Sequence, residues 1–128
     1  MLSAEQAQRY ERDGYLVLLD FKSRSEVQAA IARAHAIVEA FEPDANAAVF
    51  SSVAPEKLAD AALLASAEQV HCFFEEEAFD EHGRLRQAKA LSINKIGHAL
   101  HDRDAVFDAF SRGPALAALA SQIGRAHV

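Results

Sequence analysis

The sequence predicts an α+β fold that is mainly helical and carries only a few strands. Two segments that begin with a serine cap and repeat apolar residues at helical spacing predict helices in the first third of the chain. Aromatic and alternating segments on either side of a turn signature predict a β-hairpin further on. The 128 residues are enough for one domain.

The first predicted helix runs from Ser3 to about Asp13. Ser3 and Gln6 form a capping box, in which the hydroxyl accepts a free helix N–H and the glutamine reaches back. Gly14 favours the left-handed backbone that ends a helix. The apolar segment Tyr15–Asp20 follows directly, and its β-branched and aromatic residues predict a short buried strand.

A second capping box at Ser23 and Glu26 predicts the start of a longer helix. Its apolar residues recur at steps of three and four and form one stripe: Val27, Ile31, Ala34, Val38 and Phe41. Pro43 ends this helix. Two of the three prolines fall in residues 43–60, which predicts a surface loop, and residues 61–70 have the alanine and leucine content of a helix.

The predicted hairpin consists of a strand at His71–Phe79, a turn at Asp80–Gly83 and an alternating segment at Lys89–Gly97. Glu75–Glu77 could supply carboxylates to a metal, but three consecutive strand residues point to alternate faces and cannot converge on one ion. A solvated acidic strand edge is therefore predicted.

The last part of the sequence predicts two helices. Asp102 is the expected cap of a helix over Arg103–Ser111. Gly113 then precedes Pro114, which suits a first helical turn, and Gly124 ends this last helix.

Composition excludes several classes of function. The net charge of −6 and the absence of a basic cluster argue against nucleic-acid binding. No apolar run reaches the length of a membrane span, and the N-terminus lacks the pattern of a signal peptide. Cys72 is the only cysteine and is expected to pack as a small apolar residue. We therefore expect a soluble cytoplasmic protein.

His98, His101 and Asp102 form the first candidate site. Residues at i and i+3 of a helix face the same way, so one hypothesis is a small metal-binding site. The alternative is that the histidines pack near the strand end while Asp102 caps a helix.

Lys95 is the second candidate. In an alternating strand it points the same way as Ile93, which places it either inside the protein or at its surface. An inward lysine needs an anionic partner, whereas an outward one extends along its neighbours into solvent. Spacing alone leaves both readings open.

Four segments carry a family resemblance: Tyr10–Leu18, Phe73–Asp80, Gly83–Gln87 and Leu91–Asp102. Together they resemble the N-terminal part of the phytanoyl-CoA dioxygenase family, in particular its phytanoyl-CoA dioxygenase domain-containing branch. The resemblance extends from about residue 3 to about residue 123, so residues 1–128 are expected to be the N-terminal fragment of a single such domain.

The resemblance implies an Fe(II)- and 2-oxoglutarate-dependent dioxygenase that hydroxylates a small organic or lipid-like substrate. It also implies a double-stranded β-helix, or jelly roll, of which this chain would hold a few strands. The resemblance implies that Lys95 matches a family site residue, because a lysine in this strand helps bind 2-oxoglutarate in the family. In the family a His-x-Asp pair and a distant second histidine hold the iron.

This sequence departs from the family pattern at the metal. None of its six histidines is followed two positions later by Asp or Glu. We therefore expect a truncated or frame-shifted product or a fragment, without iron ligands or catalytic residues and inactive alone. Apolar faces intended for missing sheets would be exposed and could support self-association. A non-catalytic helical interaction module is the alternative function.

Overall fold

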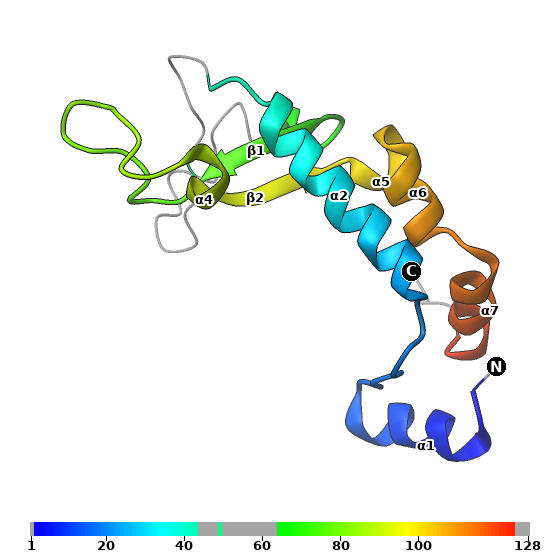
Figure 1. Ribbon diagram of the computed structural model, residues 1–128. Coiled ribbons are helices and arrows are strands. Elements are labelled where there is room, and N and C mark those ends of the chain that lie inside the picture. The colour runs from blue at the N-terminus through cyan, green and yellow to red at the C-terminus, as the bar shows by residue number, and fades with distance from the viewer. Residues whose placement is uncertain (1, 44–48, 50–63, 125–128) are drawn as a thin grey trace.

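The computed structural model describes residues 2–43, 49 and 64–124, and its elements confirm the α+β class (Figure 1). The helices are α1 (Ala4–Asp13), α2 (Arg24–Ala40), α4 (Lys89–Ser92), α5 (Leu100–Arg103), α6 (Ala105–Ser111) and α7 (Pro114–Gln122). The strands β1 (Val70–Phe74) and β2 (Ile93–His98) form an antiparallel pair. Within the described residues this pair is the whole sheet, so the jelly roll stays a prediction.

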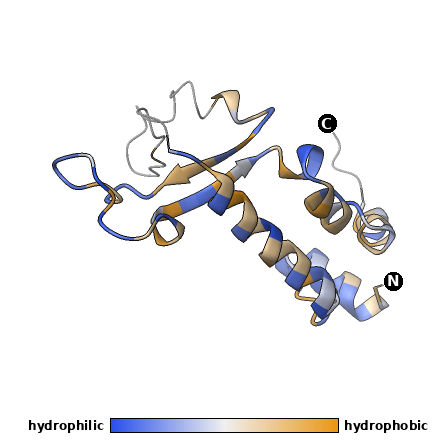
Figure 2. Cartoon of the chain, turned by 45° about the horizontal axis from the view of Figure 1, so that its top comes forward, coloured by the Kyte–Doolittle hydropathy of each residue, from blue (hydrophilic) through white to orange (hydrophobic). Residues whose placement is uncertain are grey.

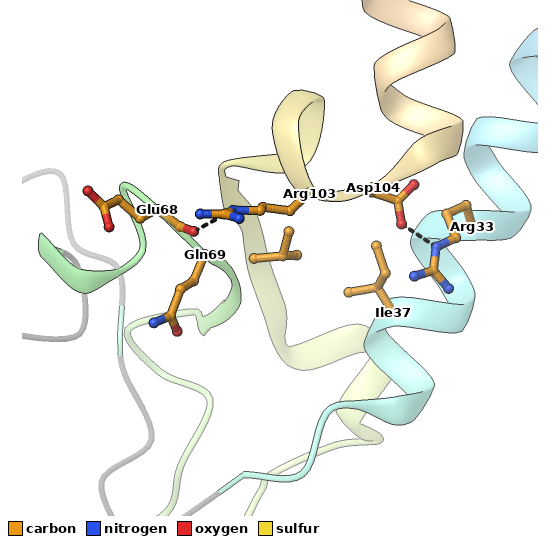
Figure 3. A pocket seen from close by; sticks show the side chains of 7 residues that line it. Arg33, Ile37, Glu68, Gln69, Arg103 and Asp104 are labelled. Carbon is orange, nitrogen blue, oxygen red and sulfur yellow. Dashed lines mark hydrogen bonds and ion pairs between the residues drawn. The ribbon is translucent and has the colours of Figure 1, made fainter.

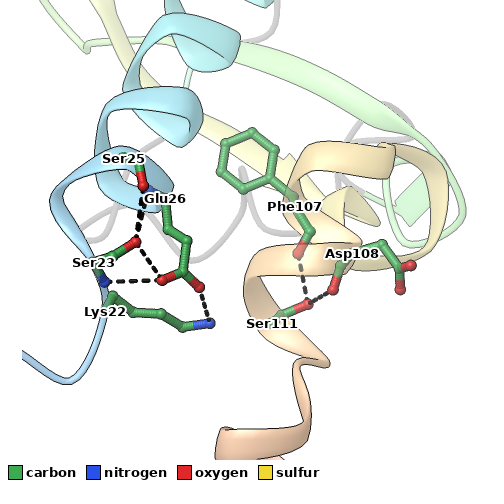
Figure 4. A network of polar contacts seen from close by, with 7 residues as sticks. All are labelled: Lys22, Ser23, Ser25, Glu26, Phe107, Asp108 and Ser111. Atoms are coloured by element: carbon green, nitrogen blue, oxygen red, sulfur yellow. Dashed lines mark hydrogen bonds and ion pairs between the residues drawn. The ribbon is translucent and has the colours of Figure 1, made fainter.

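Both predicted capping boxes are present. Ser3 Oγ accepts the N–H of Gln6 at 3.2 Å, and the Gln6 side chain accepts the N–H of Ser3 at 2.8 Å. Ser23 and Glu26 make the same exchange at 3.2 and 2.9 Å at the start of α2 (Figure 4). Gly14 ends α1 with a left-handed φ of 77°. Local capping chemistry therefore gave both helix starts correctly.

The strand predicted at Tyr15–Asp20 is wrong, because this segment has no regular secondary structure and ends in a turn. A strand is held by backbone pairing with a neighbour, and the sheet of the described residues does not include it. Exposure alternates along the segment, with Tyr15 67%, Val17 69% and Leu19 86% exposed. Its sequence has the apolar content of a strand, but the described part of the chain provides no neighbouring strand.

The predicted hairpin is confirmed, but its first strand is shorter than expected. β1 ends at Phe74, so Glu75–Glu77 lie outside it and are exposed. The turn at Asp80–Gly83 is present: Asp80 Oδ1 accepts the N–H groups of His82 and Arg84, each at 2.9 Å. Gly83 supplies the left-handed φ of 75° that this turn requires.

Two other predicted segments lie partly or mostly outside the described residues. Of the helix predicted at residues 61–70, the structure describes a helical turn only at 64–65, followed by bends that lead into β1; residues 61–63 lie outside the described part. Most of the loop predicted at 43–60 also lies outside it, apart from Pro43 and Val49.

Asp102 is not the predicted helix cap. The segment divides into α5 and α6, and Asp104 caps α6 by accepting the N–H groups of Val106 and Phe107 at 3.1 and 3.3 Å. Asp102 lies inside α5 and pairs with Arg112. The last helix is as predicted, with Pro114 in its first turn and Gly124 at a left-handed φ of 91°.

The core lies on the hairpin. The buried apolar residues are Cys72, Phe73, Phe74, Ala78 and Ala99. Phe41, just after α2, adds an aromatic ring 5.9 Å from that of Phe74. Figure 2 shows hydrophobic positions on β1 and, mixed with hydrophilic ones, along α2. No residue of α2 is buried, and Ile31 of its apolar stripe is 45% exposed, so this stripe is only partly covered in the described structure.

Candidate functional site

Lys95 lies in the middle of β2, directly opposite Phe73 of β1. Phe73 is 1% exposed, whereas Lys95 is half-buried. The lysine therefore stands beside the hydrophobic core and is partly shielded from solvent. In such a setting its charge interacts more strongly with an anion than it would in bulk water.

Strict alternation does not hold along the predicted strand. Residues 89–92 form α4, and an irregularity in the ladder places Ile93 opposite Phe74 while Lys95 is opposite Phe73. One extra residue in β2, Asn94, therefore interrupts the ladder between Ile93 and Lys95. Both residues nevertheless line the same groove against α2, so Ile93 remains a neighbour of the lysine.

Gly97 is the residue that shares a face with Lys95, because it lies two positions further along β2 and opposite His71. A Cβ placed at Gly97 would lie 3.3 Å from Cε and 3.9 Å from Cγ of Lys95. The alkyl chain of Lys95 therefore runs along the strand over the bare backbone of Gly97.

His98 and Ser66 form a polar pair next to this lysine. The Ser66 hydroxyl and His98 Nδ1 are 2.6 Å apart, and Ser66 is buried. Burial lowers the pKa of His98, and the charge of Lys95 lowers it further. The neutral imidazole of His98 is thus favoured at neutral pH. Ser66 was missed from the sequence, because only the fold brings it to His98.

The structure does not gather His98, His101 and Asp102 into a metal site. His98 is hydrogen-bonded to Ser66. His101 Nε2 lies 3.3 Å from Asp102 Oδ2, and Asp102 also forms an ion pair with Arg112. Among the described residues, no group of three or more His, Cys, Asp or Glu side chains could hold a metal ion. The metal hypothesis for this stretch therefore gains no support.

A groove of about 500 Å³ separates α2 from β2 and α4. Its lining is largely aliphatic with polar groups among it: Ile31, Ala34, His35, Val38, Glu39, Lys89, Ala90, Ile93, Asn94, Lys95 and Ile96. Lys89 donates to the backbone carbonyls of Glu39 and Phe41 at 2.8 and 2.5 Å, so it serves as a cap for the end of α2. Lys95 is the other cation in this lining.

A second pocket, of about 450 Å³, lies where α2 meets the start of β1 and α5 (Figure 3). Its charged side chains make contacts within the protein. Arg33 pairs with Asp104 at 2.5 Å, and Arg103 donates to the carbonyl of Glu68 at 3.0 Å. These contacts join elements to one another, so we assign this pocket a structural role.

Comparison with known proteins identifies the class of protein. The profile of the family described as phytanoyl-CoA dioxygenase (PhyH) matches residues 10–128. The chain is 43% identical over 122 residues to phytanoyl-CoA dioxygenase 1 of Oryza sativa subsp. japonica and 35% identical over 123 residues to phytanoyl-CoA dioxygenase of Arabidopsis thaliana. It is 34% identical over 128 residues to phytanoyl-CoA dioxygenase domain-containing protein 1 of Bos taurus.

The chain belongs to the phytanoyl-CoA dioxygenase (PhyH) family. The matches cover 95–96% of this chain but only 43–44% of each of these three relatives, so it spans less than half their length. In the described part of the chain, no helix has the length and apolarity needed to cross a membrane.

Proposed function

We propose that residues 1–128 form the N-terminal part of one Fe(II)- and 2-oxoglutarate-dependent oxygenase domain of jelly-roll type. In this proposal the complete domain hydroxylates a small organic or lipid-like molecule in the cytoplasm, and Lys95 binds a carboxylate of 2-oxoglutarate. The observation that carries it is the half-buried Lys95, opposite the buried Phe73, in a chain of this family.

The surroundings of Lys95 suit a carboxylate ligand. The ammonium group has three N–H donors and a compact charge, and the neutral form favoured for His98 adds no second cation. A hydrogen bond to a charged group contributes about 1.5–3 kcal/mol. One lysine therefore gives a modest affinity, and other parts of the domain would have to supply the remaining contacts.

The described residues do not fit the iron. They contain no cluster of three metal-ligating side chains, and the sequence has no histidine followed two positions later by an acidic residue. We propose that the 128-residue chain is inactive alone.

The lysine assignment is tested by titrating 2-oxoglutarate into the purified chain. The readout is the chemical shift of the Lys95 side chain, observed by NMR in lysine-labelled protein. We expect saturable shifts at Lys95, and weakening on the order of tenfold or more in Lys95→Ala, followed through resonances of neighbouring β1 residues. Lys22→Ala is the matched control, because it removes a different lysine, one that lies against Phe110 of α6 and does not belong to β2. Equal binding by Lys95→Ala would rule out the assignment.

Inactivity is tested separately with Fe(II), 2-oxoglutarate and oxygen. We expect no succinate above the level of a protein-free control. Succinate formation that depends on the purified chain would show that these residues hold iron after all.

Self-association is a second candidate function, supported by the exposed apolar side chains of Tyr15, Val17 and Leu19. These uncovered apolar side chains could be covered by the same segment of a second copy, since exposed apolar surface promotes association. Sedimentation should reveal dimers that Val17→Ser with Leu19→Ser weakens. A monomer at all concentrations would exclude this function.

A further inference from the structure

We propose that Gly97 is a positioning residue for Lys95: the missing side chain leaves the space in which the lysine chain lies, and so fixes where the ammonium group is presented. The inference rests on the proposed role of Lys95 in binding a carboxylate of 2-oxoglutarate. Gly97 would thus be a second residue that affects 2-oxoglutarate binding, and it would act only through the position of Lys95.

A left-handed backbone does not explain the glycine at this position, whereas the space above it is occupied by Lys95. The glycines with positive φ in the described residues are Gly14, Gly83 and Gly124, and Gly97 is not among them. Gly97 is buried, and a Cβ there would come within 3.3 Å of Lys95 Cε. Ordinary contacts of a Cβ are longer, so a methyl group at residue 97 would force the lysine chain to move.

The neighbouring strand limits where the lysine chain could go instead. Phe73 lies opposite Lys95, and His71 lies opposite Gly97. Their rings meet edge to face with centroids 5.0 Å apart, and Phe73 is 1% exposed. This packed pair borders the lysine on the β1 side. A lysine displaced from Gly97 is therefore pushed away from the sheet, and its ammonium group moves with it.

Small displacements of this kind matter for binding. A Cβ at 3.3 Å requires the lysine chain to give by a few tenths of an ångström, and productive sites hold their groups to within about 0.5 Å. We therefore expect Gly97→Ala to weaken 2-oxoglutarate binding by a factor of about two to five, less than Lys95→Ala does, because the alanine variant keeps the lysine.

The experiment is a double-mutant cycle on the complete 128-residue chain. The dissociation constant for 2-oxoglutarate is measured by NMR for the unmodified chain, Gly97→Ala, Lys95→Ala and the double variant. If Gly97 acts through Lys95, Gly97→Ala weakens binding in the unmodified chain but has no further effect once the lysine is removed. Gly113→Ala is the control, because a Cβ there meets Lys22 Nζ at an ordinary 3.6 Å.

The outcomes separate the two proposals. If Lys95→Ala leaves binding unchanged, the proposed function fails. If Lys95→Ala weakens binding but Gly97→Ala does not, the proposed function stands and the positioning role fails. Should Gly97→Ala disrupt the hairpin, the double variant is expected to restore it, since Lys95→Ala removes the crowded Cγ and Cε atoms. A double variant that stays disrupted would show that the backbone itself requires glycine, which overturns the inference.

Discussion

At the scale of single residues, Asp104 joins two helices, α2 and α6. It is 7% exposed, and its Oδ2 pairs with Arg33 of α2 while Oδ1 caps α6 through the N–H groups of Val106 and Phe107. Burial tends to raise the pKa of this carboxyl group, but the hydrogen bond from Arg33 and those from the two backbone N–H groups leave it lowered overall. The ionised form is therefore the one that the fold uses.

We predict that Asp104→Ala lowers the free energy of unfolding by about 1–3 kcal/mol. The loss combines a helix cap with the hydrogen bonds of a buried carboxylate. The share of the ion pair is small, because the Arg33 side chain is 44% exposed. Urea unfolding provides the measurement, with Asp13→Ala as the control for an exposed pair with Arg12. Equal effects of the two substitutions would contradict the role assigned to Asp104.

Glu26 gives α2 an acid-sensitive cap. Hydrogen bonds from the Ser23 side chain, the Ser23 backbone and Lys22 lower the pKa of Glu26 to about 2 from an ordinary value of 4.5 (Figure 4). Because the folded pKa is depressed, the stabilisation is complete above pH 4.5 and is lost as the pH falls towards 2. In α1 the corresponding residue is Gln6, whose amide does not titrate in this range.

The prediction is that Glu26→Gln removes this part of the pH dependence, because glutamine keeps the capping geometry without the titration. Helicity and unfolding free energy measured between pH 5 and the acid limit provide the test. An unchanged acid transition in Glu26→Gln would show that Glu26 does not contribute to it.

At the scale of elements, the sequence predicted helix ends correctly where they depend on residues close together in the chain. The caps at Ser3 and Ser23, and the last helix from Pro114, follow from interactions within one turn. The strand predicted at Tyr15–Asp20 was wrong because a strand depends on a partner that no local pattern specifies. The cap was placed at Asp102 instead of Asp104 because the intervening α5 turn has no distinct sequence signal.

Lys89 connects two elements that lie far apart in the sequence. Its ammonium group donates to two carbonyls at the end of α2, those of Glu39 and Phe41, and so fixes this end of α2 next to α4. We predict that Lys89→Met, which keeps the alkyl chain, lowers the free energy of unfolding by about 1–3 kcal/mol. Hydrogen exchange at the end of α2 should accelerate, while α1 should not change. Unaltered exchange at Phe41 would contradict this connection.

At the scale of the whole molecule, the sequence proposed Lys95 as a site residue but gave no account of its surroundings. The family pattern singled out the lysine, whereas the contacts with Gly97 and Phe73 and the nearby pair of Ser66 and His98 depend on strand register. The ladder is also irregular between Phe73 and Phe74, which simple alternation cannot reveal. The role of Lys95 therefore stays a proposal from the family resemblance, and the residues that surround it could not be predicted from the sequence.

The distribution of buried residues over the whole molecule indicates that some elements unfold locally before others. The hairpin carries the buried residues of the core, whereas α1 and α7 contain none and lie away from it (Figure 1). A hydrogen bond of 2.7 Å from the Leu2 N–H to the Gln122 side chain connects the chain before α1 with α7. Elements with few buried contacts open at low free energy, while core strands open only with global unfolding.

We therefore predict that amides of α1 and α7 exchange with solvent first and those of β1 last. Native-state hydrogen exchange, followed by mass spectrometry as denaturant is raised, measures the order. Gln122→Ala should accelerate exchange in α1 and α7 and leave Phe73 and Phe74 unchanged, because the hydrogen bond it removes lies outside the core. Equal protection of α1 and β1 would mean that the chain unfolds as one unit, and the hairpin that carries Lys95 would then depend on every helix around it.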